Sequence, residues 1–505
     1  MKSRSRCRSL TLAWTLVLLV GVSVVSCSPA FPPPPDTNVA EVIDTIQGVS
    51  ISDPYRWLEN QESAETREWI DRQNAYAEQI VGESALREEL WGRLRNWMGF
   101  DDIGSPQRGG DFEYFTMRSD DQEVPVIYRR PAPPEGELQR VDPEGDYEVV
   151  IDPHEMASDH TTRVDIQSIS SDGKLLAYSI RDGGQDETEV RVWDVEERTD
   201  LLERLPRALY SGVAFNKADE GFYYTRRSRE TGARVFFHEL GSDVVDDIEI
   251  FGEGYDPRSF INAREVDEGR YLVFTVNHGW ARSELHYKDL REETPVRAIV
   301  DDAAARFVPK FHGGLLYVRT NLDAPNNRLV AIDLENPAPD EWKEVVPEQD
   351  DVMQDFSVVA EKLYVTYLHN VSTRIKVYDL DGSSVGEISV PDFTTADFSG
   401  GPEGKAFLTT RSFVEPPTTY LLDLESGERQ VWDKRSIDFD ADGIEVSQVW
   451  YESRDQTKVP MFVVHREGLT LDGDNPTLLY GYGGFNAALT PRFDVMGCLL
   501  YTSPS

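Results

Sequence analysis

The spacing of apolar residues changes twice along the chain. Over residues 63–97 apolar positions recur every three or four residues, which predicts two amphipathic helices. After Gly99 the period becomes two, and glycine and proline interrupt the pattern every few residues, which predicts short strands and turns. We therefore expect an N-terminal helical segment over residues 40–100 and a mainly β region over residues 101–435.

The β region contains an internal repeat. A short apolar strand recurs seven times, and after the first interval the copies lie roughly 45 residues apart, close to the length of one four-stranded propeller blade. The copies begin near Glu113, Leu175, Phe222, Tyr271, Leu315, Leu363 and Ala406. The repeat predicts a seven-bladed β-propeller. An array of β-sandwiches is the alternative, but it needs a linker between domains, and no linker interrupts the repeat.

The pattern changes again after Arg435. Two strands are predicted at residues 446–451 and 459–464, and the apolar run Pro476–Tyr480 predicts a buried strand that leads into the glycine-rich stretch Gly481–Phe485. Backbone amides in such a stretch can approach a ligand closely, and in α/β hydrolases one of them stabilises the oxyanion. The same glycines could instead form only a tight turn.

The N-terminus has the features of an export signal. Four basic residues precede the apolar run Leu10–Val25, which is too short to span a membrane comfortably. The run ends at Cys27 in a pattern that resembles a bacterial lipobox, so we expect residues 1–27 to be a lipoprotein signal peptide and Cys27 to carry the lipid. An ordinary secretory signal is the alternative. The proline-rich residues 28–39 are expected to form a stiff tether.

Composition excludes several classes of partner. The chain has 51 Lys and Arg against 91 Asp and Glu residues, a net charge of −40, which disfavours binding to nucleic acid or to anionic membrane surfaces. Its three cysteines are too scattered for a disulfide framework or a cysteine-based zinc site. The acidic run that starts at Asp438 begins like a calcium loop, but its twelfth position is Val449. We expect no metal and no cofactor.

Several segments in combination resemble the prolyl oligopeptidase family of serine peptidases. They are Asp53–Glu59, the propeller repeat, Lys458–His465, Tyr480–Asn486 and Thr490–Pro491. The resemblance implies that the propeller caps the active site of an α/β-hydrolase domain and admits only short peptides. It also implies that residues 40–100 pack with that domain, of which residues 436–497 are the incomplete beginning.

The resemblance assigns roles to five residues. Tyr482 matches a tyrosine whose hydroxyl donates to the oxyanion, and removal of such a donor typically costs about 2.7–4 kcal/mol. Phe485 matches an aromatic residue of the substrate pocket, with Gly483 and Gly484 beside it. Tyr210 matches a propeller aromatic that contacts the substrate farther from the scissile bond. The alternative for each aromatic residue is a place in the core.

A catalytic serine is not evident. Ser384 lies in a Gly-x-Ser-x-Gly string, but strands flank it on both sides, and a nucleophile elbow needs a strand followed by a helix. The resemblance places the serine, aspartate and histidine of the family downstream of the glycine-rich stretch, and none of the eight histidines is a candidate. Residues 498–505 depart from the family pattern and match one reading frame of a sequencing adapter, so we expect them to be foreign.

Together these features predict that the complete parent protein is a monomeric, exported serine endopeptidase anchored by lipid in the periplasm or at the cell surface. By resemblance it cleaves short peptides after proline through an acyl-enzyme, whereas this chain is expected to be inactive. A propeller that binds a partner without catalysis is the alternative.

Overall fold

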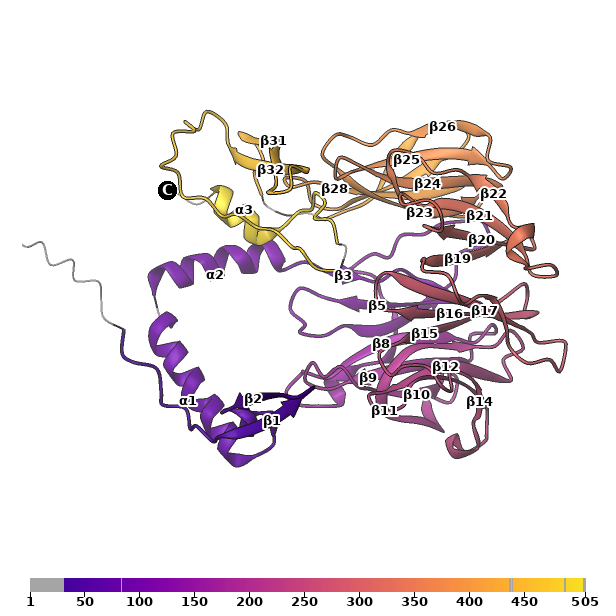
Figure 1. Ribbon diagram of the computed structural model, residues 1–505, viewed down its shortest axis with the longest axis horizontal. Coiled ribbons are helices and arrows are strands. Elements are labelled where there is room, and N and C mark those ends of the chain that lie inside the picture. Colours follow the sequence, from indigo (N-terminus) through magenta and orange to yellow (C-terminus); the bar gives the residue numbers. More distant parts are fainter. Residues whose placement is uncertain (1–30, 83, 436, 438, 486, 503–505) are drawn as a thin grey trace, which may run out of the picture. The chain divides into compact units, whose positions relative to one another are not determined.

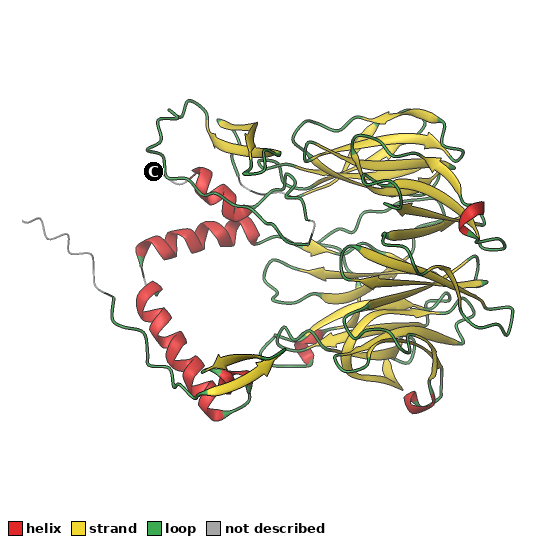
Figure 2. Cartoon of the chain, in the orientation of Figure 1, coloured by secondary structure: helices red, strands yellow, loops and turns green. Residues whose placement is uncertain are grey.

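The computed structural model describes residues 31–82, 84–435, 437, 439–485 and 487–502, and strands dominate it (Figure 2). The predicted signal peptide and Cys27 lie outside the described residues. The chain divides into two compact units, residues 1–92 and 93–505. None of the described helices is long and apolar enough to cross a membrane.

The first unit contains a β-hairpin and a helix. Its elements are β1 (Val42–Ile46), β2 (Val49–Asp53), a short 3-10 helix (Arg56–Glu59), α1 (Ala64–Val81) and the start of α2 (Ala85–Met98). The Ser63 side chain caps α1 by accepting the backbone N–H of Thr66 at 3.2 Å. The two helices occupy the range where the apolar spacing predicts them. The hairpin is not predicted, because its strands are mostly exposed and carry no buried alternation.

Six antiparallel sheets of four or more strands form the described part of the second unit up to residue 435 (Figure 1). The first sheet contains β3 (Asp102–Ile103), β4 (Gln107–Gly109), β5 (Phe112–Arg118), β6 (Val126–Pro131) and β7 (Glu148–Ile151). The second contains β8 (Arg163–Ile169), β9 (Leu175–Arg181), β10 (Thr188–Asp194), β11 (Thr199–Phe215), β12 (Gly221–Ser228), β13 (Gly232–Glu239) and β14 (Ile248–Phe251).

The remaining four sheets each have four strands in chain order. Two of them are β15 (Phe260–Val266), β16 (Tyr271–His278), β17 (Arg282–Asp289) and β18 (Arg297–Val300), then β19 (Phe307–His312), β20 (Leu315–Thr320), β21 (Arg328–Asp333) and β22 (Lys343–Val346). The last two are β23 (Val352–Val359), β24 (Lys362–His369), β25 (Ser372–Asp379) and β26 (Ser384–Ile388), then β27 (Thr395–Gly400), β28 (Lys405–Arg411), β29 (Thr418–Asp423) and β30 (Arg429–Lys434). Short 3-10 helices cover Pro153–Glu155, Val244–Asp246 and Pro339–Glu341.

The architecture is therefore mainly β, a β-propeller with few helices. Each of the seven repeat copies begins within one residue of the start of a strand, namely β5, β9, β12, β16, β20, β24 or β28. Seven separate sheets were expected, however, and two copies share the seven-stranded sheet. The reason is β11, a 17-residue strand that pairs with β10 through its first half and with β12 through its second half.

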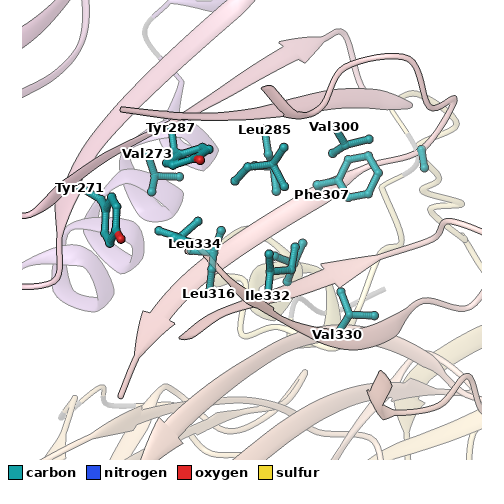
Figure 3. Close-up of a cluster of buried hydrophobic side chains, with 13 residues drawn as sticks. Tyr271, Val273, Leu285, Tyr287, Val300, Phe307, Leu316, Val330, Ile332 and Leu334 are labelled. Atoms are coloured by element: carbon teal, nitrogen blue, oxygen red, sulfur yellow. The ribbon is translucent and has the colours of Figure 1, made fainter. Parts of the chain in front are cut away.

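The core lies between adjacent sheets. Figure 3 shows one such cluster, in which Tyr271, Val273 and Leu285 of one sheet pack against Phe307, Leu316 and Ile332 of the next. Strand alternation explains this arrangement, because every second side chain points to the neighbouring sheet. Ion pairs also join the first and last sheets: Arg140 pairs with Asp433, and Arg435 pairs with Asp102 at 3.5 Å.

The region after residue 435 differs from the prediction. β31 (Ile444–Glu452) and β32 (Lys458–Arg466) confirm the two predicted strands and pair with each other in an antiparallel hairpin, and α3 spans Val495–Thr502. The predicted buried strand at Pro476–Tyr480 is wrong, because the segment is irregular and Leu478, Leu479 and Tyr480 are 65–79% exposed. A strand needs hydrogen-bonding neighbours, and the described residues supply none here. The described part of residues 436–497 thus forms no recognisable α/β-hydrolase domain.

Candidate functional site

The glycine-rich stretch lies in an irregular segment at the surface. Tyr482 is 49% and Phe485 60% exposed, Gly483 is exposed and Gly484 is half-buried. The rings of Tyr482 and Phe485 are 6.3 Å apart. Phe485 has a φ of +58°, a left-handed backbone conformation that costs a bulky residue energy. Two of the predicted site residues are therefore close together, on backbone that no sheet holds.

Trp280 joins this segment to the propeller. It lies at the tip of the turn between β16 and β17, and its ring is 5.3 Å from that of Phe485 at an interplanar angle of 54°. Sequence reasoning missed Trp280. A signal was present in the sequence His-Gly-Trp. A tryptophan in a turn is expected to have a packing partner, because so large an apolar side chain is seldom left without one.

Tyr210 occupies a different sheet. It lies in β11, half-buried, with its hydroxyl donating to the carbonyl of Pro206 and its ring 6.1 Å from that of Tyr224. Burial raises the pKa of the Tyr210 hydroxyl above its ordinary value. The described contacts of Tyr210 are thus local, and the structure brings together Tyr482, Phe485 and Trp280 rather than these residues and Tyr210.

A cavity is lined by the first strands of several sheets. The cavity, of about 750 Å³, is bordered by β15, β19, β23 and β27, with Asn262, Arg264, Lys310, His312, Ser357 and Ser399 among its lining residues. Charged groups along it pair with one another, since Lys310 Nζ lies 2.9 Å from Asp355 Oδ1 and Lys217 Nζ lies 2.8 Å from Glu268 Oε2. Apolar side chains such as Phe311 and Leu316 also line the cavity, so its lining is mixed.

A second hollow of about 570 Å³ lies near Tyr210. It is lined by Asp182, Glu189, Arg191 and Arg207, and Arg207 follows the Pro206 that accepts the Tyr210 hydrogen bond. Its charges are paired, with Arg207 on Asp182 at 2.5 Å and Arg191 on Glu189 at 2.6 Å.

The described residues do not form a site with an activated nucleophile. Ser384 is exposed at the start of β26, directly after a hairpin turn, as the sequence pattern predicts. Seven of the eight histidines lie beside a carboxylate, and His465 Nδ1 lies beside the Arg466 carbonyl. No group of three or more His, Cys, Asp or Glu side chains in the described part of the chain is arranged to hold a metal ion.

One serine, one histidine and one carboxylate are linked by consecutive hydrogen bonds. Ser259 Oγ lies 3.1 Å from His278 Nδ1, and His278 Nε2 lies 2.7 Å from Glu284 Oε1. In a catalytic triad the serine bonds to Nε2 and the acid to Nδ1, so the two nitrogens are exchanged here. Ser259 is also only 2% exposed and cannot reach a peptide. This chain of bonds is therefore not an acyl-transfer site.

Comparison with known families decides the affiliation. The family described as prolyl oligopeptidase, N-terminal beta-propeller domain, matches residues 34–435. The chain belongs to the prolyl oligopeptidase family. It is 31% identical over 478 residues to a prolyl endopeptidase of Elizabethkingia meningoseptica, covering 92% of this chain and 66% of that protein. It is 27% identical to the dual function macrocyclase-peptidase POPB of Galerina marginata, covering 91% of this chain and 68% of that protein.

Solved prolyl oligopeptidase structures agree. One from a structural and mechanistic study of two prolyl endopeptidases superimposes with a TM-score of 0.82 at 29% identity, covering 91% of this chain and 68% of that one. Prolyl oligopeptidase B of Galerina marginata, bound to a macrocyclization substrate, gives a TM-score of 0.78 at 26% identity, covering 92% and 69%. The chain spans about two thirds of the length of the curated relatives it matches.

Proposed function

We propose that the complete protein is a serine endopeptidase that cleaves short peptides after proline by acyl-enzyme chemistry. The observation that carries the proposal is the match of 92% of this chain to a relative named prolyl endopeptidase. Other members of the family accept basic residues in place of proline, so the preference for proline rests on the names of the relatives.

The propeller regulates access in this proposal. In this proposal the seven-stranded sheet counts as two blades that share β11, because the first half of β11 pairs with β10 and its second half pairs with β12. The ion pair of Arg140 with Asp433, between the first and last sheets, supports a closed ring. We propose that the cavity of about 750 Å³ along the first strands admits short peptides and excludes folded proteins.

The residue roles follow from chemistry and resemblance. Tyr482 would donate its hydroxyl to the developing oxyanion, since a neutral phenol can be aimed at negative charge. Phe485 would line the pocket for the residue before the scissile bond, and Gly483 and Gly484 let the backbone approach the substrate. Tyr210 would contact the substrate farther away. No metal or cofactor takes part, and the enzyme acts as a monomer.

A test of activity checks the expected inactivity of this chain. The 505-residue chain should neither hydrolyse a proline-containing peptide nor react with a serine-directed phosphonate, because none of its described residues forms an accessible Ser–His pair. Mass spectrometry of the phosphonate-treated chain is the measurement. Stoichiometric labelling of any serine, including Ser384 or Ser259, would overturn the proposed inactivity.

The alternative is a propeller that binds a partner without catalysis, which the lack of a hydrolase domain among the described residues favours. Extending the coding DNA past Phe493 distinguishes the two. An in-frame Gly-x-Ser-x-Gly motif between a strand and a helix would support the peptidase, and its absence would support the binding protein.

The proposed location is outside the cytoplasm, on a lipid anchor at Cys27. The basic residues, the apolar run and the lipobox-like ending support it. Labelled fatty acid should be incorporated by the parent chain in a bacterial host and not by the Cys27→Ser variant; equal labelling of both would refute the anchor.

A further inference from the structure

A hydrogen-bonded cluster lies at the base of the turn that carries Trp280. We call it the Glu284 cluster, and its members are Tyr255, Ser259, His278, Arg282, Glu284 and His286. His278 is the last residue of β16 and Arg282 the first of β17, and the two pair across the turn. The three turn residues between them, Gly279–Ala281, are exposed.

The carboxylate of Glu284 is saturated with hydrogen bonds. Its Oε1 lies 2.7 Å from His278 Nε2 and 2.8 Å from Arg282 Nη2. Its Oε2 lies 2.9 Å from the Tyr255 hydroxyl and 3.1 Å from His286 Nε2. A carboxylate accepts about four hydrogen bonds, so all of its acceptor sites are filled. The Glu284 side chain is only 7% exposed, and a buried charge is tolerated only with such partners.

The network determines the state of its histidines. His278 donates from Nε2, because this nitrogen faces the Glu284 carboxylate, and His286 Nε2 lies 3.1 Å from both Glu284 Oε2 and the Tyr255 hydroxyl oxygen. In the neutral ring this leaves His278 Nδ1 as the acceptor for the Ser259 hydroxyl at 3.1 Å. Burial disfavours the charged carboxylate, but hydrogen bonds from His286, Tyr255 and His278 outweigh it and hold the pKa of Glu284 below its ordinary value.

Contacts to the rest of the protein anchor the same cluster. Arg282 Nη2 also donates to the carbonyl of Asp301 at 2.6 Å, which ties the base of the turn to the residue after β18. Tyr255 lies in the loop before β15, next to the ion pair of Asp256 with Arg258. The base of the turn is therefore held by contacts from β17, from the residue after β18 and from the loop before β15.

We propose that Glu284 is a positioning residue that holds the Gly279–Ala281 turn so that Trp280 packs against Phe485. The Trp280 side chain is 58% exposed. The hydrogen bonds of His278 and Arg282 anchor the two ends of the turn that carries it. Release of His278 and Arg282 would let the turn move and separate the two rings. The consequence for catalysis rests on the proposed function, because it matters only if Phe485 lines the substrate pocket.

The isosteric variant Glu284→Gln tests the proposal. A glutamine side chain has one acceptor oxygen and an NH₂ group in place of the second oxygen. Two of the four groups that donate to Glu284 would therefore face the NH₂ group and lose their hydrogen bonds. Glu203→Gln is the matched control: Glu203 is also buried, at 6% exposure, but its described bond is from the Gly241 N–H at 2.7 Å, which a glutamine carbonyl retains.

Fluorine NMR of the full chain labelled with fluorotryptophan provides the measurement. The Trp280→Phe variant identifies the Trp280 resonance by its loss, and Phe485→Leu gives the position of that resonance without the ring contact. We expect Glu284→Gln to shift the Trp280 resonance toward its position in Phe485→Leu, and Glu203→Gln to leave it in place. The remaining tryptophan resonances report whether each variant is folded.

Two outcomes would overturn the proposal: an unmoved Trp280 resonance in folded Glu284→Gln, or equal shifts in Glu284→Gln and Glu203→Gln. If Glu284→Gln does not fold, Tyr255→Phe decides, because it removes one donor and keeps the ring; a shifted resonance supports the proposal and an unmoved one refutes it. The measurement needs no peptidase activity, so its failure is distinct from failure of the proposed function.

Discussion

Single residues in this molecule take their roles from partners on other strands. Glu284 reads as an ordinary polar position of a strand, yet it accepts hydrogen bonds from Tyr255, His278, Arg282 and His286. Tyr482 and Phe485 were identified through the resemblance to the family, and the structure adds Trp280 as the residue that contacts Phe485. Residue type alone could not reveal that contact, because it joins segments far apart in the chain.

Gly382 illustrates a residue whose role the sequence pattern disguises. It belongs to the Gly-x-Ser-x-Gly string, but its φ is +90°, and a Cβ there would lie 1.8 Å from the Val345 carbonyl oxygen of the neighbouring sheet. We expect Gly382→Ala to lower the free energy of unfolding by about 2–3 kcal/mol, because strain and overlap add.

The control for this prediction is Gly386→Ala in the same string. A Cβ at Gly386 has no atom within 4 Å, and its φ is outside the left-handed region. Its effect should stay within about 0.5 kcal/mol. Urea unfolding of the two variants is the measurement, and equal losses in both would contradict the packing role of Gly382.

At the scale of elements, β11 is the strand that the repeat did not predict. Its Thr199–Ala208 half pairs with β10 and its Leu209–Phe215 half with β12, without a turn between them. The two halves share no pairing partner. The backbone of the strand is therefore continuous, but its first half pairs only with β10 and its second half only with β12. The exposed glycine at position 212, with a φ of +117°, lies within the register shift of the second half.

This division predicts tolerance to insertion. A Gly-Ser insertion between Ala208 and Leu209 should leave the thermal unfolding transition cooperative and cost about 1 kcal/mol, chiefly from the Tyr210–Pro206 hydrogen bond. The same insertion between Val273 and Phe274 in β16 should abolish cooperative unfolding, because it shifts part of a buried central strand by two residues relative to both β15 and β17. Equal damage at both positions would show that β11 acts as one undivided strand.

At the scale of the whole molecule, tyrosines are spread through the cores between sheets. Tyr178, Tyr224 and Tyr367 are nearly or fully buried, and burial, followed by hydrogen bonds to Asp200, Asp247 and Tyr378, raises the pKa of each hydroxyl. Burial likewise raises the pKa of Tyr223 to about 12. The folded chain therefore keeps these protons at a pH where the unfolded chain releases them.

Stability should consequently fall in alkali. The pKa of tyrosine in an unfolded chain is about 10, so the contribution of Tyr223 is complete below about pH 10 and is lost as the pH rises to about 12. Tyr223→Phe should leave stability at neutral pH nearly unchanged and reduce the alkaline loss by about 1–2 kcal/mol. Urea midpoints measured across this range test it. Tyr451→Phe, at a residue 49% exposed, is the control; an identical alkaline loss in both variants would refute the assignment.

The sequence by itself determined the features that depend on neighbours along the chain. Apolar spacing placed the two helices and one strand in each of the seven repeat copies, because a buried helix face or strand face repeats with its own period. Only the tertiary structure decided that β11 joins two repeat copies in one sheet, that Pro476–Tyr480 stays irregular, and that Trp280 contacts Phe485. Each of these depends on hydrogen-bonding or packing partners that are distant in the chain, and local periodicity carries no information about whether such a partner is present.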